Sequence, residues 1–374
     1  MSPAPGHAFG LDALRATAVA SVLLAHGSLF HADAHPGARF VLVIFGVLGV
    51  EIFFALSGFL VGRQLLLVAE GRAGLWRFLV RRWVRTLPNY FLFLAINAAL
   101  VWWVIDRQHP DARFLWFGQA LAWPATSQFF PESWSLAIEE WFYLIAALGF
   151  ALAAAMRASP RTLGWALVAV LVAGPVARLA VQLAAAVPID AGVRKISLTR
   201  LDALAYGLGC AWLERYRPER FERLKAVAVR VIGVVLAIAG AVLLAAWSID
   251  LRVFEPARSL RDQVLAAALF SALPMAAACA LPFLSSWRPA RGRLVGGIGH
   301  VSAWSYSIYL VHFPLLLVMG QRWVVPAGDA AWSVARTTTW LVATLGLSAL
   351  VYARFESPLL RRRPSLRRPQ DLSA

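Results

Sequence analysis

The first apolar stretch of the chain, LDALRATAVASVLLAH, contains three ionisable side chains: Asp12, Arg15 and His26. In an α-helix, eleven residues turn through about 1100° and rise about 16 Å, so Arg15 and His26 project from one face. Asp12 can pair with Arg15 one turn away. An imidazole can take a proton from a hydroxyl, and a guanidinium can stabilise an oxyanion, so this face predicts acid–base chemistry. Anchoring of these charges among lipid headgroups is the alternative.

A second polar stripe occurs in SWSLAIEEWFYL, where three side chains spaced four apart share one helical face: Ser135, Glu139 and Tyr143. A carboxylate inside an apolar helix is costly unless it has a function or a partner. We expect Glu139 to orient His26 and to stabilise its protonated form, as carboxylates do in catalytic triads. A structural ion pair of Glu139 with Arg15 or Arg200 is the alternative.

Polar side chains also occur in two other motifs. In SYSIYLVHFP, three of them share a helical face: Ser305, Tyr309 and His312. They would line the same cavity and bond an acceptor, or form interhelical hydrogen bonds that fix the packing. In FFALSGFLVG, Ser57 stands next to Gly58, which lets two backbones approach closely or interrupts a helix.

A basic motif provides candidate ligands for phosphate groups. RRWVR contains Arg81, Arg82 and Arg85, and arginine matches phosphate oxygens with paired donors. Simple anchoring by positive charge is the alternative for this cluster.

In TRLDALAYG, Thr199 and Asp202 have the spacing of a capping box at the start of a helix. Capping alone would explain Asp202, whereas Arg200 beside it is a candidate ligand for an acceptor or a donor.

The composition defines the class of protein in which these residues act. Of the 374 residues, 60% are hydrophobic and 15% charged, and the mean hydropathy is +0.66. Soluble chains have about 45–50% apolar and about 25% charged residues, so the sequence indicates a membrane protein. The net charge of +16 resides in short basic clusters between apolar runs, which points to anionic lipid and not to nucleic acid. The two cysteines lie in apolar runs and predict no disulfide or metal site.

A membrane-spanning helix needs about 20 mostly apolar residues. By this criterion we expect an all-α, polytopic membrane helical bundle with about ten transmembrane helices. The predicted spans are residues 11–30, 41–68, 86–105, 134–156, 163–187, 199–214, 229–249, 263–284, 301–319 and 333–353.

The distribution of Lys and Arg predicts the orientation. With both termini in the cytoplasm, the cytoplasmic loops and tail hold about twice as many basic residues as the opposite loops. We therefore expect a multi-pass protein of the bacterial inner (cytoplasmic) membrane, with one transmembrane domain at residues 1–356. Residues 357–374 are expected to form a basic, disordered cytoplasmic tail.

Taken together, the motifs resemble the acyltransferase-3 family of integral membrane acyltransferases. The stretches that carry the resemblance follow in order: GLDALRATAVASVLLAH, FFALSGFLVG, RRWVRTLPNY, SWSLAIEEWFYL, TRLDALAYG, SYSIYLVHFP and RFESP. The first matches the family's Arg-x10-His pair with Arg15 and His26, and the third matches its Arg-Arg-x-x-Arg-x-x-Pro loop at residues 81–90.

The resemblance implies that acyl-CoA, most often acetyl-CoA, is the donor, and that the reaction uses no metal. The acceptor would be a hydroxyl of a glycan or lipid-linked glycan, as in lipopolysaccharide or an exported polysaccharide. In this interpretation His26 deprotonates the acceptor, assisted by Glu139 and Arg15, and the RRWVR arginines bind the donor. The remaining candidates would bind substrate: Asp12, Ser57, Ser135, Tyr143, Arg200, Asp202, Tyr309 and His312.

Two other functions fit the same residues. A transporter or flippase of a lipid-linked or polar substrate would use the buried charges as a relay and would not need coenzyme A. An acyl-relay protein would pass only the acyl group across the membrane, to a separate periplasmic transferase.

Overall fold

The computed structural model describes residues 8–31, 36–105, 111–121, 130–185, 187–227, 257, 259–289, 292–324 and 329–366. The long helices in these ranges are α1 (Phe9–Gly27), α2 (Pro36–Ala69), α3 (Leu75–Leu100), α4 (Ser133–Ala155), α5 (Pro160–Ala184), α6 (Leu201–Tyr216), α8 (Leu260–Leu284), α9 (Arg293–Arg322) and α10 (Ala330–Val351). Shorter helical segments are η1 (Ser28–Phe30), η2 (Val101–Ile105), η3 (Ala112–Trp116), η4 (Gly118–Ala120), η5 (Asp190–Arg194), η6 (Tyr352–Glu356) and α11 (Ser357–Arg361).

Eight helices of the described part are long and apolar enough to cross a membrane. The protein is therefore an all-α, polytopic membrane bundle, as predicted. The predicted sixth span is α6, whose 16 residues rise only about 24 Å, less than the roughly 30 Å of a bilayer core. The predicted seventh span, residues 229–249, lies outside the described residues, so the expected ten spans are not reached in the described part.

Local capping determines where several helices begin. Ser159 accepts a hydrogen bond from the backbone N–H of Thr162, and Pro160 occupies the first turn of α5. Asp329 accepts from the N–H of Trp332 at the start of α10. The first N–H groups of a helix have no partner within it, and leaving them without a hydrogen bond is costly in lipid. These side chains supply the missing acceptors.

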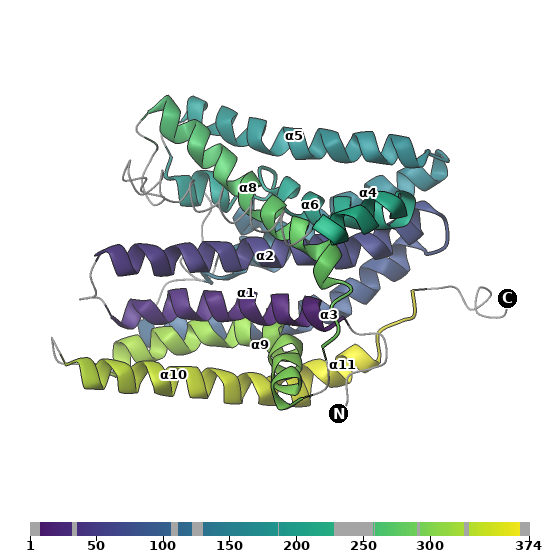
Figure 1. Cartoon of the computed structure of the whole chain (residues 1–374). Coiled ribbons are helices and arrows are strands. Elements are labelled where there is room, and N and C mark those ends of the chain that lie inside the picture. Colours follow the sequence, from purple (N-terminus) through teal and green to yellow (C-terminus); the bar gives the residue numbers. More distant parts are fainter. Residues whose placement is uncertain are drawn as a thin grey trace.

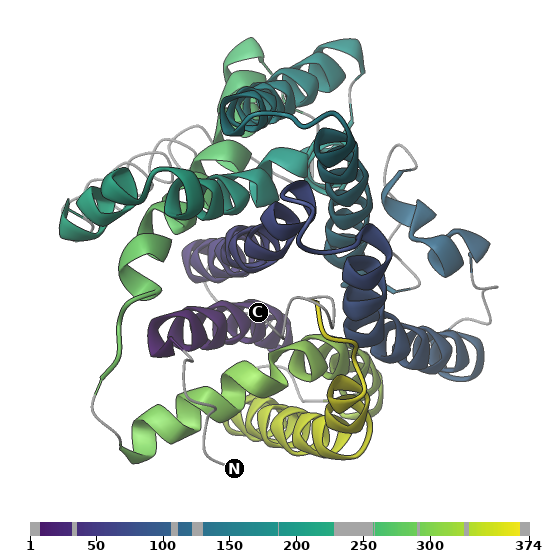
Figure 2. The same ribbon diagram turned by 90° about the vertical axis from the view of Figure 1, so that its right-hand side faces the viewer.

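Helix α2 lies inside the bundle and packs against α1, α4, α6 and α8, while α9 packs between α1 and α10 (Figure 1, Figure 2). The N-terminal end of α1 and helix α11 lie at the same end of the bundle (Figure 1). The crossing of α2 and α6 is close: a Cβ atom added to Gly58 or Gly207 would collide with the backbone of the opposite helix. Gly58 thus allows close backbone approach, and α2 continues through it without interruption.

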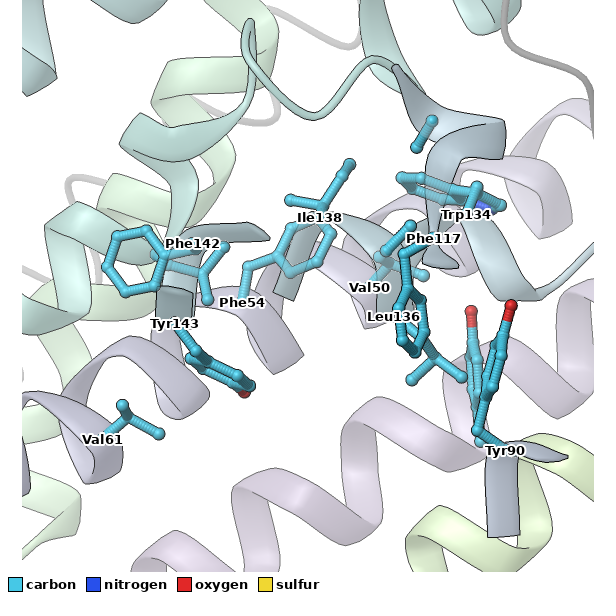
Figure 3. Close-up of a cluster of buried hydrophobic side chains, with 14 of the residues drawn as sticks. Val50, Phe54, Val61, Tyr90, Phe117, Trp134, Leu136, Ile138, Phe142 and Tyr143 are labelled. Carbon is cyan, nitrogen blue, oxygen red and sulfur yellow. The ribbon is translucent and has the colours of Figure 1, made fainter. Parts of the chain in front are cut away.

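Buried apolar side chains fix the inner faces of α2, α3 and α4 (Figure 3). Phe54, Tyr90, Trp134, Phe142 and Tyr143 all belong to this cluster and are buried. Aromatic side chains of this size bury a large area each, so the cluster stabilises the relative positions of the three helices. Several polar residues of the site, among them Ser57, Arg82 and Glu139, project from these same helices.

The stretch RRWVRTLPNY is helical, and the expectation of a loop there is wrong. Helix α3 begins at Leu75 and includes Pro88. Phe78 and Leu79 near its start are buried in the apolar core. A hydropathy window treats every arginine as exposed to lipid, so it places the start of this span after Arg85. In the structure the guanidinium groups face a polar cavity, so the helix can begin well before them.

The C-terminal segment differs from the disordered tail that was expected. Helix α11 directly follows η6, and Leu366 packs against the apolar core. The carbonyl oxygen of Pro364 accepts a hydrogen bond of 2.9 Å from Nη1 of Arg81. The chain is therefore ordered against α3 as far as Leu366, and residues 367–374 lie outside the described ranges.

Candidate functional site

A cavity of about 330 Å³ lies between α1, α2, α3, α4 and α9, a size typical of small-molecule sites. Its charged lining within the described residues consists of five guanidinium groups and one carboxylate: Arg15, Arg81, Arg82, Arg85, Arg363 and Glu139. Its other polar lining residues are Ser57, Gln64, Thr86, Ser135, Ser305, Tyr306 and Tyr309. This excess of cations in one cavity favours an anionic ligand.

The RRWVR arginines, which were predicted to bind phosphate, line the cavity together. The guanidinium of Arg82 lies 4.3 Å from the ring centroid of Tyr143, and its buried Nε has no hydrogen-bond partner among the described residues. Within those residues, none of Arg81, Arg82 and Arg85 forms an ion pair within 4.0 Å. Donors without a carboxylate partner suit a ligand that supplies the acceptors.

The predicted pair of Asp12 and Arg15 is present. Nη1 of Arg15 lies 3.7 Å from Oδ1 of Asp12. The hydroxyl of Ser302 on α9 bridges the two: it donates to Asp12 at 2.7 Å and accepts from Arg15 at 3.2 Å. Sequence reasoning missed Ser302, although it lies one turn before Ser305 on the polar face of α9. The bridge holds the Arg15 guanidinium at the cavity wall.

Glu139 belongs to a hydrogen-bonded chain at the cavity wall. Tyr143 donates to Oε2 of Glu139 at 2.7 Å, and its hydroxyl oxygen lies 2.5 Å from Oγ of Ser57. The predicted pairing of Glu139 with His26 is wrong. Glu139 lines the cavity together with Arg15, whereas His26 lies about 16 Å further along α1.

The partner of His26 is His312. Nδ1 of His26 lies 2.8 Å from Nε2 of His312, and Nδ1 of His312 lies 3.1 Å from the carbonyl oxygen of Ile308. A carbonyl only accepts, so the proton of a neutral His312 resides on Nδ1 and its Nε2 accepts from Nδ1 of His26. Nε2 of a neutral His26 then keeps its lone pair and is the basic nitrogen.

Tyr309 stands between the cavity and the two histidines. Its hydroxyl lies 2.7 Å from Oγ of Ser135 and donates to the carbonyl of Glu132 at 3.0 Å. Its ring centroid is 5.7 Å from that of His312. Tyr309 and Ser135 line the cavity, but His26 is not among the lining residues. The arginine-lined cavity and the histidine pair are thus separate, and Tyr309 contacts both.

Arg200 and Asp202 lie away from the cavity in buried ion pairs. Nη1 and Nη2 of Arg178 each lie 2.8 Å from a carboxylate oxygen of Asp202. Arg200 pairs with Glu51, and all four side chains are fully buried. The capping box is also wrong, because α6 starts without a side-chain cap and Thr199 donates to backbone carbonyls instead.

Four polar or charged cavity residues were not foreseen: Gln64, Thr86, Tyr306 and Arg363. Tyr306 donates to the carbonyl oxygen of Thr86 at 2.8 Å and thereby ties α9 to α3. Arg363 belongs to the basic run RRRPSLRR, which was counted only as an orientation signal. No spacing rule distinguishes Arg363 from its basic neighbours, so only the fold of the segment reveals it.

Comparison with known proteins identifies the family of the chain. A family model described as an acyltransferase domain matches residues 9–353. A Komagataeibacter xylinus protein, provisionally named membrane-bound transacylase BcsY, is 30% identical over 155 residues, which cover 36% of this chain and 35% of that protein. A protein of Bacillus subtilis (strain 168), provisionally named peptidoglycan O-acetyltransferase YrhL, is 36% identical over 156 residues, covering 36% of this chain and 22% of that protein.

The two matches span about a third and about a fifth of the relatives' own lengths. No solved structure is similar enough to the chain to count as a match. The family model covers the predicted motifs up to the last of the eight candidate spans and includes every charged cavity residue except Arg363. The chain is therefore a multi-pass membrane protein that belongs to the acyltransferase-3 family.

Proposed function

We propose that the protein is a membrane O-acyltransferase that moves an acyl group, in the first place acetyl, from acyl-CoA to a hydroxyl of a cell-envelope or exported glycan. The observation that carries this proposal is the arginine-lined cavity, whose Tyr309 wall contacts the His26–His312 pair. The name of the Bacillus subtilis relative supports a sugar hydroxyl as the acceptor. The charge distribution supports an inner-membrane protein with both termini in the cytoplasm.

The donor would bind with its phosphates at the arginines. Coenzyme A carries several phosphate groups at one end and its thioester at the other, which suits a cavity with cations in one region and hydroxyl groups in another. Arg15 is three helical turns from His26, so it would bind the donor and would not reach a carbonyl attacked beside His26. This changes the role expected for Arg15 from oxyanion stabiliser to donor ligand.

His26 would act as the general base. Its Nε2 would take the proton of the acceptor hydroxyl while the hydroxyl oxygen attacks the thioester carbonyl. The new carbon–oxygen bond forms, the carbon–sulfur bond breaks, and the thiolate of coenzyme A leaves with the proton that His26 returns. His312 would hold the His26 ring in the tautomer that makes this possible.

The test is transfer by purified protein in nanodiscs, supplied with labelled acetyl-CoA and glycan acceptors. Wild-type protein should label the glycan, and His26→Ala should lose at least about 100-fold of the rate. His300→Ala is the matched control, because His300 is an exposed histidine of α9 that stacks on Trp304.

Three results would count against the proposal. A fully active His26→Ala protein would remove the general base. Movement of a substrate without thioester consumption would indicate a transporter or flippase. Cleavage of the thioester without glycan labelling would indicate an acyl relay to a separate transferase.

A further inference from the structure

The C-terminal segment carries an arginine back to the cavity. Arg363 lies after the last predicted span, yet its side chain lines the cavity with Arg81, Arg82 and Arg85. We infer that Arg363 is a further guanidinium ligand of the donor phosphates beside Arg81, Arg82 and Arg85, and that residues 357–366 form a strap that holds it there. This inference rests on the proposed function and specifies which part of the donor the C-terminal segment would bind.

The strap is fixed at its beginning. It follows Glu356, whose buried Oε2 accepts hydrogen bonds from Asn89 of α3 at 3.1 Å and from Ser307 of α9 at 2.7 Å. These two contacts lock the end of η6 between the helices that line the cavity. Helix α11 then starts at a defined place and direction.

The strap is also fixed at its far end. Arg81 donates to the carbonyl of Pro364 at 2.9 Å, and Leu366 packs against the apolar core. Arg363 lies between these anchors and is partly buried, whereas its neighbour Arg362 is exposed. Of these two adjacent arginines, the fold places only Arg363 at the cavity.

The guanidinium groups of Arg81, Arg82, Arg85 and Arg363 repel one another when no anion is present. Burial, followed by the neighbouring Arg81, Arg85 and Arg82 charges, lowers the pKa of Arg363 to about 10. Glu139 is the single carboxylate among the described lining residues and does not balance them. A bound polyanion would relieve this repulsion, so the cluster favours a ligand with several negative charges.

Phosphate fits this cluster better than a single carboxylate does. Each guanidinium can present paired donors to phosphate oxygens, and several guanidiniums can share a ligand with more than one phosphate. Within the proposed reaction, the donor thioester is the substrate that carries such groups.

The experiment compares binding of coenzyme A to full-length protein in nanodiscs by calorimetry. Arg363→Gln should weaken binding about tenfold to hundredfold, the range of a charge-assisted hydrogen bond. Arg362→Gln removes the same charge one residue away and should bind like wild type. Arg363→Lys should fall between them, because it keeps the charge and loses the paired donors.

A second ligand, a pantetheine derivative without phosphates, separates a local loss from misfolding. Its binding should be equal in wild-type and Arg363→Gln protein; unequal binding would indicate a damaged cavity and overturn the assignment. Equal coenzyme A affinity in wild type and Arg363→Gln would overturn this inference and leave the proposed function intact. If wild type itself fails to bind coenzyme A or its thioesters, the proposed donor is wrong.

Discussion

Nδ1 of His26 lies 2.8 Å from Nε2 of His312, and this contact joins helices α1 and α9 across 286 positions of the chain. The carbonyl of Ile308 fixes the proton of His312 on the opposite ring nitrogen. His312 is thus a positioning residue for the proposed base. Its main-chain carbonyl also accepts from Nε1 of Trp340 at 2.9 Å, which stabilises this turn of α9.

Replacing His312 should affect turnover more than donor binding. His312→Phe removes the acceptor for His26, so we expect kcat to fall about 100-fold or more while KM for acyl-CoA changes little. His312→Gln offers an amide oxygen in place of Nε2 and should restore part of kcat. A purely structural role would instead lower the folded fraction of both variants and leave no difference between them in kcat per folded molecule.

Tyr143 has two separable contacts. Tyr143→Phe keeps the ring beneath Arg82 but leaves Ser57 and Glu139 without their shared partner, so the free energy of unfolding should fall by about 1–3 kcal/mol. Coenzyme A affinity should persist in this variant. Tyr143→Ala removes the ring as well and should weaken coenzyme A binding in the same calorimetric assay. Equal affinity of both variants would exclude a role of the ring in placing Arg82.

Asp202 tests the difference between a structural and a substrate-binding role. Asp202→Ala leaves the buried Arg178 without its carboxylate, and breaking a buried pair costs about 3–5 kcal/mol. We expect a large loss of thermal stability in detergent and an unchanged KM for acceptor in the protein that remains folded. A raised KM with unchanged stability would restore the substrate-binding role that the sequence suggested.

Asp190 provides a pH-dependent prediction outside the candidate spans. Burial opposes its ionisation, but Arg194 at 2.7 Å and Lys195 at 2.5 Å outweigh this and lower the pKa of the carboxyl. A lowered pKa stabilises the fold above the unfolded value of about 3.9 and loses that contribution as pH falls through the folded value. Asp190→Asn should therefore lower the melting temperature at pH 7.

The same substitution should have less effect in acid. As the pH falls below about 3.9 towards the lowered folded pKa, the unfolded chain binds the proton before the folded chain does, so the two melting temperatures should approach each other. A difference that is as large at pH 3 as at pH 7 would show that the ion pairs are not its source.

Local geometry explains what the sequence could predict. The pair of Asp12 and Arg15, and the stripe through Ser135, Glu139 and Tyr143, depend only on helical periodicity and proved correct. The membrane bundle was also predictable, because the length of each apolar segment is a local property of the sequence. Both of these polar groupings were therefore placed on the correct helical faces before any contact between helices was known.

The features that the sequence could not predict depend on contacts between helices. The partner of His26 lies on α9 and that of Asp202 on α5, and neither choice follows from periodicity. The sequence did not distinguish Arg363 from the basic residues beside it, because its position at the cavity depends on how the strap packs against α3. The start of α3 was misplaced since hydropathy takes no account of a cavity that solvates arginine inside the bundle.

The arginines of α3 have two tasks in a single stretch of chain. As cations in the first half of α3 they influence which way the nascent segment inserts, and as cavity residues they would hold the donor. Neutral replacements would disturb both membrane insertion and ligand binding. The measured rates would then average over correctly and wrongly inserted molecules. Lysine at the same positions retains the topogenic charge and loses only the fork-shaped donor pair, so it is the substitution that separates biogenesis from chemistry.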